Sequence, residues 1–253
     1  CGLLDYDKPL ISKRPFRSPH HSASAAGIIG GGAKVRPGEI TLAHRGVLFL
    51  DEMVEFPRQV LEVLRQPLED GVVTISRAAG SLKFPANFIL LAAMNPCPCG
   101  FLGDPKKHCT CSDYQIKRYR SRLSGPLLDR IDLQIEVARL SEDELLNIKE
   151  DAEDSKTVRQ RVVRARSIQL ERYKKEGILT NSELNAKLVK KYCKTDETSE
   201  NMLRFAISKF DLSARAYERI LKISRTIADL DESENITSSH IACALQFRGI
   251  TPV

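Results

Sequence analysis

The sequence has 253 residues and an ordinary composition for a soluble globular protein, with 42% hydrophobic and 28% charged residues and no tryptophan. No apolar stretch approaches the roughly 20 residues that a membrane-spanning helix needs, and the N-terminus lacks a secretory signal, so we expect a cytoplasmic protein without membrane contact. The formal net charge of +6 is compatible with an anionic partner but does not identify one.

Residues 1–138 form the first region, in which short apolar runs alternate with loops rich in glycine and proline. The segment 57–71 carries apolar residues at helical spacing and predicts a helix between two strands. Strands that alternate with a helix favour an α/β layer with a parallel sheet. We expect the strand at 47–50 to be buried on both faces. The predicted strands are 47–50, 72–75, 88–94 and 131–137.

Residues 139–253 form the second region, in which helical periodicity replaces the strand pattern. Ser141 and Glu144 form a capping box that predicts a helix start. The remaining apolar and polar spacing predicts an all-α region. The expected helices include a long basic one at 156–175, followed by segments at 182–193, 199–210, 213–230 and 238–247.

The run at 47–50 leads directly into two adjacent carboxylates, Asp51 and Glu52, in the sequence GVLFLDE. Open α/β sheets bind their ligands at the carboxyl ends of the strands. In a nucleotide site the first acid would help to hold a magnesium ion on the phosphates, and the second would polarise the water that attacks the γ-phosphate. A strand that ends in a solvated acidic turn gives the same letters, so the motif alone leaves both interpretations open.

A phosphate-binding loop, G-x-x-x-x-G-K-[ST], should accompany such acids. The nearest candidate is GIIGGGAKVRPGE at 27–39. It fails because Lys34 follows alanine, Val35 replaces the hydroxyl residue, and Pro37 blocks the helix that should follow. We interpret this segment as a flexible glycine loop.

Three further polar residues are candidates for the same site. Asn95 ends the run 88–94 and could orient the attacking water, or it could simply mark a turn. Arg130 is expected at an exposed corner, where it could reach the γ-phosphate of a neighbouring subunit or pair with Asp129 or Asp132. Arg215 lies in the first turn of a predicted helix, where a solvated face is the default interpretation.

Four of the seven cysteines lie close together in PCPCGFLGDPKKHCTC. Four thiolates can complete a tetrahedral zinc shell, which predicts a structural zinc rather than a catalytic one because no coordination position stays open. His108 could replace one ligand. Reduced thiols in a loop, or an oxidisable cluster, are the alternatives. The predicted ligands are Cys97, Cys99, Cys109 and Cys111.

Four motifs occur in one order: GVLFLDE, AAMNP, SGPLLDRIDL and LSARAYERIL. Together they resemble the magnesium-chelatase-like AAA+ ATPases, specifically the bacterial ComM (YifB) family, over about residues 14–249. The resemblance implies a partial P-loop-type AAA+ core, with a β-hairpin before the sensor 1 strand, followed by an all-α lid domain. It also implies a hexameric ring that uses ATP and Mg²⁺ to move DNA in branch migration during natural transformation.

The resemblance assigns a role to each motif residue. Asp51 and Glu52 would be the Walker B pair, and Asn95 would be sensor 1. Arg130 would be the arginine finger acting on a neighbouring subunit, and Arg215 the sensor 2 arginine of the lid. The phosphate loop of the family would precede residue 1, so ATP hydrolysis is expected of the complete protein.

Two basic elements are candidates for contact with DNA. The segment 72–84 reads as a hairpin, and in related helicases such a hairpin projects into the central pore. Its positive charges, Arg77 and Lys83, would contact phosphates. The helix at 156–175 is a second DNA surface, or a solvated helix that contacts acidic loops of a neighbour.

Two other functions compete with the DNA motor. A magnesium-chelatase-type motor subunit belongs to the same class of enzyme, although the cysteine cluster and the RPFRSPHH segment fit it less well. A non-catalytic, zinc-bearing DNA-binding or scaffold protein would need none of the ATP-site residues.

Overall fold

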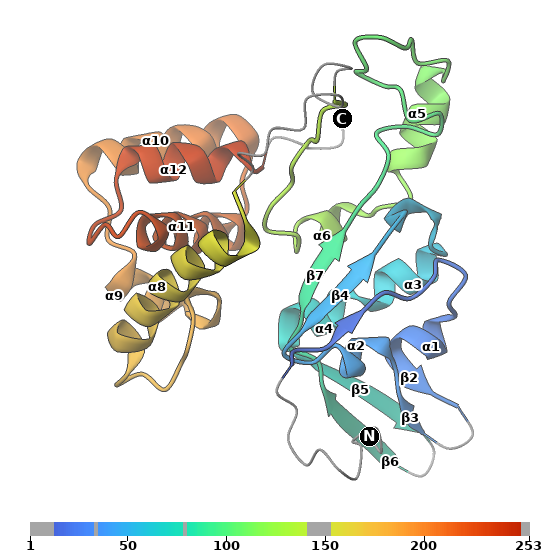
Figure 1. The fold of residues 1–253 in the computed structure, drawn as a ribbon, viewed down its shortest axis with the longest axis horizontal. Helices are drawn as coiled ribbons and strands as arrows, with labels where there is room; N and C mark the ends of the chain where they lie inside the picture. The colour runs from blue at the N-terminus through green and yellow to red at the C-terminus, as the bar shows by residue number, and fades with distance from the viewer. Residues whose placement is uncertain (1–12, 33–34, 78–79, 141–152, 249–253) are drawn as a thin grey trace. The chain divides into compact units, whose positions relative to one another are not determined.

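A computed structural model of the chain describes residues 13–32, 35–77, 80–140 and 153–248 (Figure 1). The chain divides into two compact units, Cys1–Ile131 and Asp132–Thr251. The helix start predicted at Ser141 lies outside the described residues. None of the described helices is both long and apolar enough to cross a membrane.

A three-stranded parallel sheet lies at the centre of the first unit, in the order β1–β4–β7. Its strands are β1 (Phe16–Arg17), β4 (Val47–Leu50) and β7 (Ile89–Ala92). The register pairs Arg17 with Leu48, and Leu50 with Ala92. The sheet confirms the predicted α/β class, and its parallel pairing brings the three carboxyl ends to one edge.

Helices cover one face of this sheet. Leu48 and Leu50 are buried against them, whereas Val47 and Phe49 on the opposite face are only half-buried. Ile89 pairs with Val47 and is 65% exposed. The prediction that the strand at 47–50 is buried on both faces is therefore wrong within the described part of the first unit, because no helix described there covers the second face. The helical segments of this unit are α1 (Ala25–Ile29), α2 (Glu39–Leu42), η1 (Met53–Glu55), α3 (Arg58–Val63), α4 (Arg65–Asp70), α5 (Asp113–Arg120) and α6 (Gly125–Leu128).

The helix predicted at 57–71 forms as two short helices, α3 and α4, which meet at Leu64. Pro67 lies inside α4, and a proline there lacks the N–H that would continue the hydrogen-bond ladder from α3. Gly71 ends α4 with a positive φ of 65°, a conformation that glycine adopts at little cost.

Two antiparallel pairs complete the first unit. β5 (Val72–Arg77) and β6 (Gly80–Pro85) form the predicted hairpin, as a sheet separate from the parallel one. β2 (Gly30–Gly31) pairs with β3 (Arg36–Pro37) in the segment expected to be a flexible loop. The expectation of a loop is wrong for the described part, because the segment contains the end of helix α1 and the paired strands β2 and β3.

The strand predicted at 131–137 does not form. The segment has no regular secondary structure, and Leu133, Ile135 and Val137 are 47%, 66% and 87% exposed. An alternating apolar pattern becomes a strand only when another strand satisfies its backbone groups, and no described strand lies beside this segment.

The second unit is all-α, as the sequence predicts. Polar N-caps begin several of its helices, among them Asp154, Asn185, Asp196 and Ser213, each accepting a hydrogen bond from a backbone N–H of the first turn. Ile220 and Ile241 are fully buried in its separate core. The helices are α8 (Ser155–Tyr173), η2 (Asn181–Glu183), α9 (Ala186–Tyr192), α10 (Glu197–Phe210), α11 (Ala214–Leu230) and α12 (Ser238–Gln246).

Candidate nucleotide site and metal centre

Asp51 and Glu52 follow β4 directly and are exposed at the carboxyl edge of the sheet. Asp51 Oδ1 accepts a hydrogen bond of 2.9 Å from the N–H of Glu52. Glu52 has φ 49° and ψ 46°, in the left-handed region that non-glycine residues rarely occupy. The turn therefore presents both carboxylates to solvent, where a hydrated cation could reach them.

Asn95 reaches the same edge through β7. The Ala93 N–H donates to the Leu50 carbonyl at 3.0 Å, and the Met53 N–H donates to the Ala93 carbonyl at 2.9 Å. These two bonds extend the β4–β7 pairing past the ends of the strands, and Asn95 lies two residues further, exposed. In Figure 1 the arrowheads of β4 and β7 point towards this edge and towards α5 beyond it.

His21, to which the sequence analysis assigns no role, contacts this site. His21 Nδ1 lies 3.4 Å from Glu52 Oε2. No local pattern in the sequence marks this contact. It follows from the register between β1 and β4, which pairs Arg17 with Leu48 and so brings together the residues four positions further along each segment.

Arg130 differs from its expected place at an exposed corner. Its side chain is 13% exposed, its Nε lies 3.0 Å from Glu69 Oε2, and its Nη1 donates to the Pro126 carbonyl at 2.6 Å. The expected partner Asp132 instead pairs with Arg219 at 2.8 Å. Arg130 lines a pocket of about 500 Å³ together with residues of α3 and α4. The correction follows from α4, which brings Glu69 to Arg130 from a distant part of the sequence.

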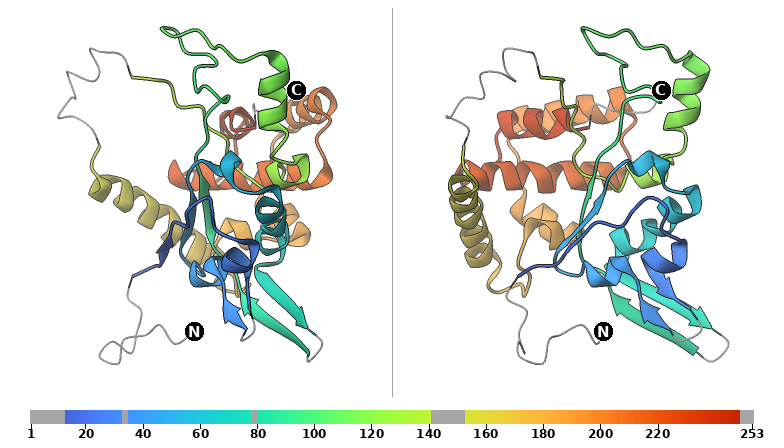
Figure 2. Two further views of the ribbon diagram at one scale, coloured as in Figure 1. Left: turned by 90° about the vertical axis from the view of Figure 1, so that its right-hand side faces the viewer. Right: turned by 45° about the vertical axis from the view of Figure 1, so that its right-hand side comes forward.

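The hairpin lies at the end of the unit opposite to the carboxyl edge of the sheet (Figure 2). Lys83 is exposed and pairs with Thr74 across the two strands. Val73 is buried on the other face, so the hairpin presents a polar face with Lys83 to solvent. Arg77 is the last residue of β5, where it pairs with Gly80.

Arg215 belongs to the second unit, in the first turn of α11, and is exposed. The basic helix predicted at 156–175 is α8. Several of its arginines already have acidic partners: Arg161 lies 2.8 Å from Glu153, and Arg164 lies 3.2 Å from Glu232. Part of its positive charge is thus neutralised within the unit.

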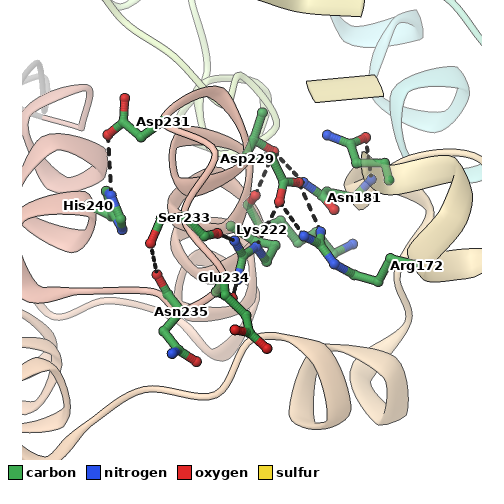
Figure 3. A network of polar contacts seen from close by, with 12 residues as sticks. Arg172, Asn181, Lys222, Asp229, Asp231, Ser233, Glu234, Asn235 and His240 are labelled. Carbon is green, nitrogen blue, oxygen red and sulfur yellow. Dashed lines mark hydrogen bonds and ion pairs between the residues drawn. The ribbon is translucent and has the colours of Figure 1, made fainter. Parts of the chain in front are cut away.

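A buried polar network joins α8, η2 and α11 (Figure 3). Asp229, with no exposed side-chain surface, accepts hydrogen bonds from Arg172 at 2.9 and 2.5 Å, from Arg225 at 3.1 Å and from Asn181 at 2.8 Å. Burial by itself lowers the pKa of Arg172, yet the hydrogen bonds to Asp229 raise it above its ordinary value. This carboxylate is structural, because protein donors surround it.

The four clustered cysteines come together after Asn95. Cys97, Cys99 and Cys109 have sulfur separations of 3.4, 3.5 and 3.6 Å, and all four sulfurs, with that of Cys111, lie within 4.8 Å of one another. The sulfurs of a tetrahedral zinc site with Zn–S bonds of about 2.3 Å are about 3.8 Å apart. The cysteines are not bonded as disulfides, so the donor set fits a zinc ion.

The acidities of these thiols also fit a cation. A backbone N–H of Phe101 is the main cause that lowers the pKa of Cys99 to about 5. A backbone N–H of Cys111 favours the Cys109 thiolate, but burial and the neighbouring thiols raise the pKa of Cys109 to about 12. The Cys99 thiolate therefore forms easily, and it makes deprotonation of the neighbouring thiols harder. A divalent cation would supply the positive charge that further thiolates need.

The cysteine loop is attached to the same edge of the sheet. Gly100 and Gly103 have φ of 82° and 83°, as required by a chain that turns back on itself. Arg120 of α5 donates to the Pro96 carbonyl at 3.3 Å. Arg122 pairs with Glu55, close to the acids, at 3.1 Å. A metal here would brace the loop that follows Asn95.

Comparison with protein families matches both parts of the chain. Residues 2–145 match the family described as magnesium chelatase, subunit ChlI, and residues 152–248 match the family described as magnesium chelatase, subunit ChlI C-terminal.

Individual relatives agree with this result. The competence protein ComM of Haemophilus influenzae is 50% identical over 238 residues, 94% of this chain and 46% of the relative. The protein YifB of Escherichia coli is 44% identical over 239 residues, 94% of this chain and 46% of the relative. The magnesium-chelatase subunit ChlI of Bigelowiella natans is 28% identical over 96 residues, 38% of this chain and 21% of the relative. The chain thus spans about half the length of ComM and YifB. It belongs to the magnesium-chelatase-like AAA+ family, within which it is a member of the ComM/YifB group.

Proposed function

We propose that the complete protein is an ATP-driven AAA+ motor that acts on DNA, in branch migration or helicase-like remodelling during recombination and natural transformation. The observation that carries this proposal is the exposed edge where Asp51, Glu52 and Asn95 meet, in a chain of the ComM/YifB group. A nucleotide phosphate with its metal ion is the ligand that such an edge suits. We place the protein in the cytoplasm, where thiols stay reduced.

The proposal gives each of the five residues one role. Asp51 would help to hold Mg²⁺, which supplies charge neutralisation on the phosphates when bound. Glu52 would accept a proton from the attacking water, and Asn95 would orient that water by a hydrogen bond. Arg130 would act on the nucleotide of a neighbouring subunit in a hexameric ring, and Arg215 on its own subunit's nucleotide.

The phosphate loop would come from the half of the relatives' length that this chain does not span. Two apolar surfaces support this view. Ile89 and Leu91 on β7 are 65% and 52% exposed, and the alternating residues of 131–137 are exposed as well. An added strand beside β7 would satisfy the backbone of the sheet edge, and added helices on the second face would cover Ile89 and Leu91.

DNA would contact the hairpin β5–β6. Lys83 lies on its exposed polar face, and Arg77 stands at the turn. Contacts from such residues to phosphates are independent of sequence, as a motor on DNA requires. Since the hairpin and the acids lie at opposite ends of the first unit, the parallel sheet between them would connect ATP hydrolysis to movement of the hairpin (Figure 1).

The cysteine cluster would hold a structural zinc through Cys97, Cys99, Cys109 and Cys111. With four protein ligands, the metal would leave no position for a substrate. Its contribution would be mechanical, since the loop begins directly after Asn95 and is attached to α5 by Arg120. Residues 97–111 would therefore keep the proposed water-orienting amide in place.

The test is ATP hydrolysis by the complete protein, with and without branched DNA. We expect Glu52→Gln to lower the rate by about 10²-fold or more, because the proposed proton acceptor is lost. Glu55→Gln is the matched control: this acid lies three residues away, pairs with Arg122 and should leave the rate unchanged.

Other outcomes distinguish the competing functions. DNA binding without ATP hydrolysis in the unmodified protein would favour the scaffold. Hydrolysis that responds to a porphyrin substrate and not to DNA would favour the chelatase-type motor. Equal rates for the unmodified protein and Glu52→Gln would refute the assignment of Glu52.

A further inference from the structure

The segment that follows β1 ends beside the proposed catalytic acid. β1 and β4 run parallel, with Arg17 opposite Leu48, so their continuations leave the sheet at the same edge. His21 Nδ1 then lies 3.4 Å from Glu52 Oε2, within the distance of an ion pair. The side chains are 37% and 56% exposed, so water and a nucleotide can reach the contact.

The ring of His21 is held on two sides. It packs against the His20 ring, with centroids 4.0 Å apart, and its edge meets the ring of the fully buried Phe56 at 6.4 Å. His20 is itself fixed, because its Nδ1 contacts the Ser22 hydroxyl at 2.8 Å and accepts from the Ser22 N–H at 3.3 Å. An imidazole supported in this way offers Glu52 a fixed partner.

The backbone of Glu52 is constrained as well. Its left-handed conformation is strained for a non-glycine residue, and it persists only where neighbouring contacts hold it. The Asp51 carboxylate accepts the Glu52 N–H, and the Glu52 carbonyl accepts the Glu55 N–H at 2.7 Å. With the backbone fixed, the direction of the carboxylate depends on its side-chain torsions and on what contacts its oxygens.

We infer that His21 is a positioning residue for Glu52. A proton on Nδ1 would bind Oε2, which fixes one carboxylate oxygen and leaves the other to accept the proton of the attacking water. The inference rests on the proposed function, in which Glu52 is the proton acceptor. An ordinary surface ion pair would also give this distance, but it would contribute little to stability and nothing to catalysis.

The experiment compares three substitutions of His21 in the complete protein by steady-state ATP hydrolysis. Asparagine can place its amide nitrogen where Nδ1 stands, whereas glutamine places it near Nε2. We expect His21→Ala to lower kcat about tenfold with KM for ATP within about twofold, since misplacement of a catalytic group affects the chemical step. His21→Asn should recover most of the rate and His21→Gln should not.

A double-mutant cycle with Glu52→Asp tests whether His21 acts through this carboxylate. Because the shorter side chain withdraws from the imidazole, His21→Ala should have almost no further effect in that background. An undiminished tenfold effect there would overturn the inference. An unchanged kcat for His21→Ala, or equal recovery of kcat by His21→Asn and His21→Gln, would also overturn it. The same holds if all three variants lose kcat in proportion to a lower thermal unfolding midpoint.

The two proposals fail differently. If Glu52→Gln is as active as the unmodified protein, the proposed function of Glu52 fails and the inference fails with it. If Glu52→Gln is inactive while His21→Ala has the unmodified kcat, only the positioning role of His21 is overturned.

Discussion

Asp51 and Glu52 in the first unit are exposed to solvent, whereas Asp229 in the second unit has no exposed side-chain surface. The exposed pair contacts its own turn and the ring of His21. Asp229 instead receives hydrogen bonds from Arg172, Arg225 and Asn181 (Figure 3). The same functional group thus occurs in an open site and in a closed one.

The difference shows how burial and hydrogen-bond partners separate an acid that is open to a ligand from a structural one. A carboxylate surrounded by protein donors cannot bind an incoming cation without breaking those bonds. A carboxylate at an open strand end can bind a cation without such a loss. The four predictions that follow alter one side of this comparison at a time.

The largest effect on stability is expected when the buried acid is replaced by asparagine, and the same substitution of an exposed acid is the comparison. Asp229→Asn would leave Arg172 and Arg225 without their buried counter-charge and should destabilise the second unit by about 3–5 kcal/mol. Asp51→Asn should change stability by about 0.5 kcal/mol or less, since the site is exposed. Urea unfolding monitored by amide hydrogen exchange, which reports on each unit separately, measures both changes in the free energy of unfolding. Equal losses would mean that burial does not separate the two acids.

The proposed metal centre is expected to have the next largest effect. Purified protein should contain about one zinc per chain, and Cys109→Ser should lose most of it because three ligands remain. Ser121→Ala, in the same unit and outside the cluster, is the control. Metal analysis and thiol titration provide the measurements. Protein with no zinc and four freely titrating thiols would contradict the assignment.

A smaller effect is expected at the contact between Glu69 and Arg130. Glu69→Gln removes the charge but keeps the shape, and it should lower the stability of the first unit by about 1 kcal/mol. Arg130→Ala should abolish most ATP hydrolysis by the assembled protein, while Glu69→Gln should leave most of it. If both variants lose hydrolysis equally, Glu69 is itself required for the reaction.

The smallest effect is expected at the hairpin. Lys83→Ala should weaken DNA binding a few-fold and reduce the slope of log affinity against log salt by about 0.9, the contribution of one phosphate contact to duplex DNA. Lys190→Ala, an exposed lysine on α9, should leave the slope unchanged. Titrations at several salt concentrations give both slopes. Identical slopes for Lys83→Ala and the unmodified protein would remove this lysine from the DNA surface.

The sequence predicted the helices and strands more accurately than the tertiary contacts around them. The strand at 47–50, the hairpin at 72–84 and the long basic helix all form, because their periodicity and turn residues are local properties. The strand at 131–137 failed although its pattern was equally clear. Its alternation describes which side chains would share a face, but a strand also needs a neighbouring strand, and that neighbour is a tertiary feature.

The candidate site shows the same division. The order of Asp51, Glu52 and Asn95 along the chain was sufficient to predict a common edge, since parallel strands end together. The close approach of the four cysteines also agrees with their spacing. The burial of Arg130 was not predicted, because Glu69 lies 61 residues away and only the packing of α4 brings it near.

By itself, then, the sequence determined the α/β and all-α regions, the acids at a strand end and the cluster of thiols, since each depends on residues close together in the chain. Only the tertiary structure decided that His21 meets Glu52, that Glu69 holds Arg130, and that Asp229 is enclosed by arginines. These contacts depend on strand register and helix packing, which join distant parts of the chain and leave no local pattern in the sequence.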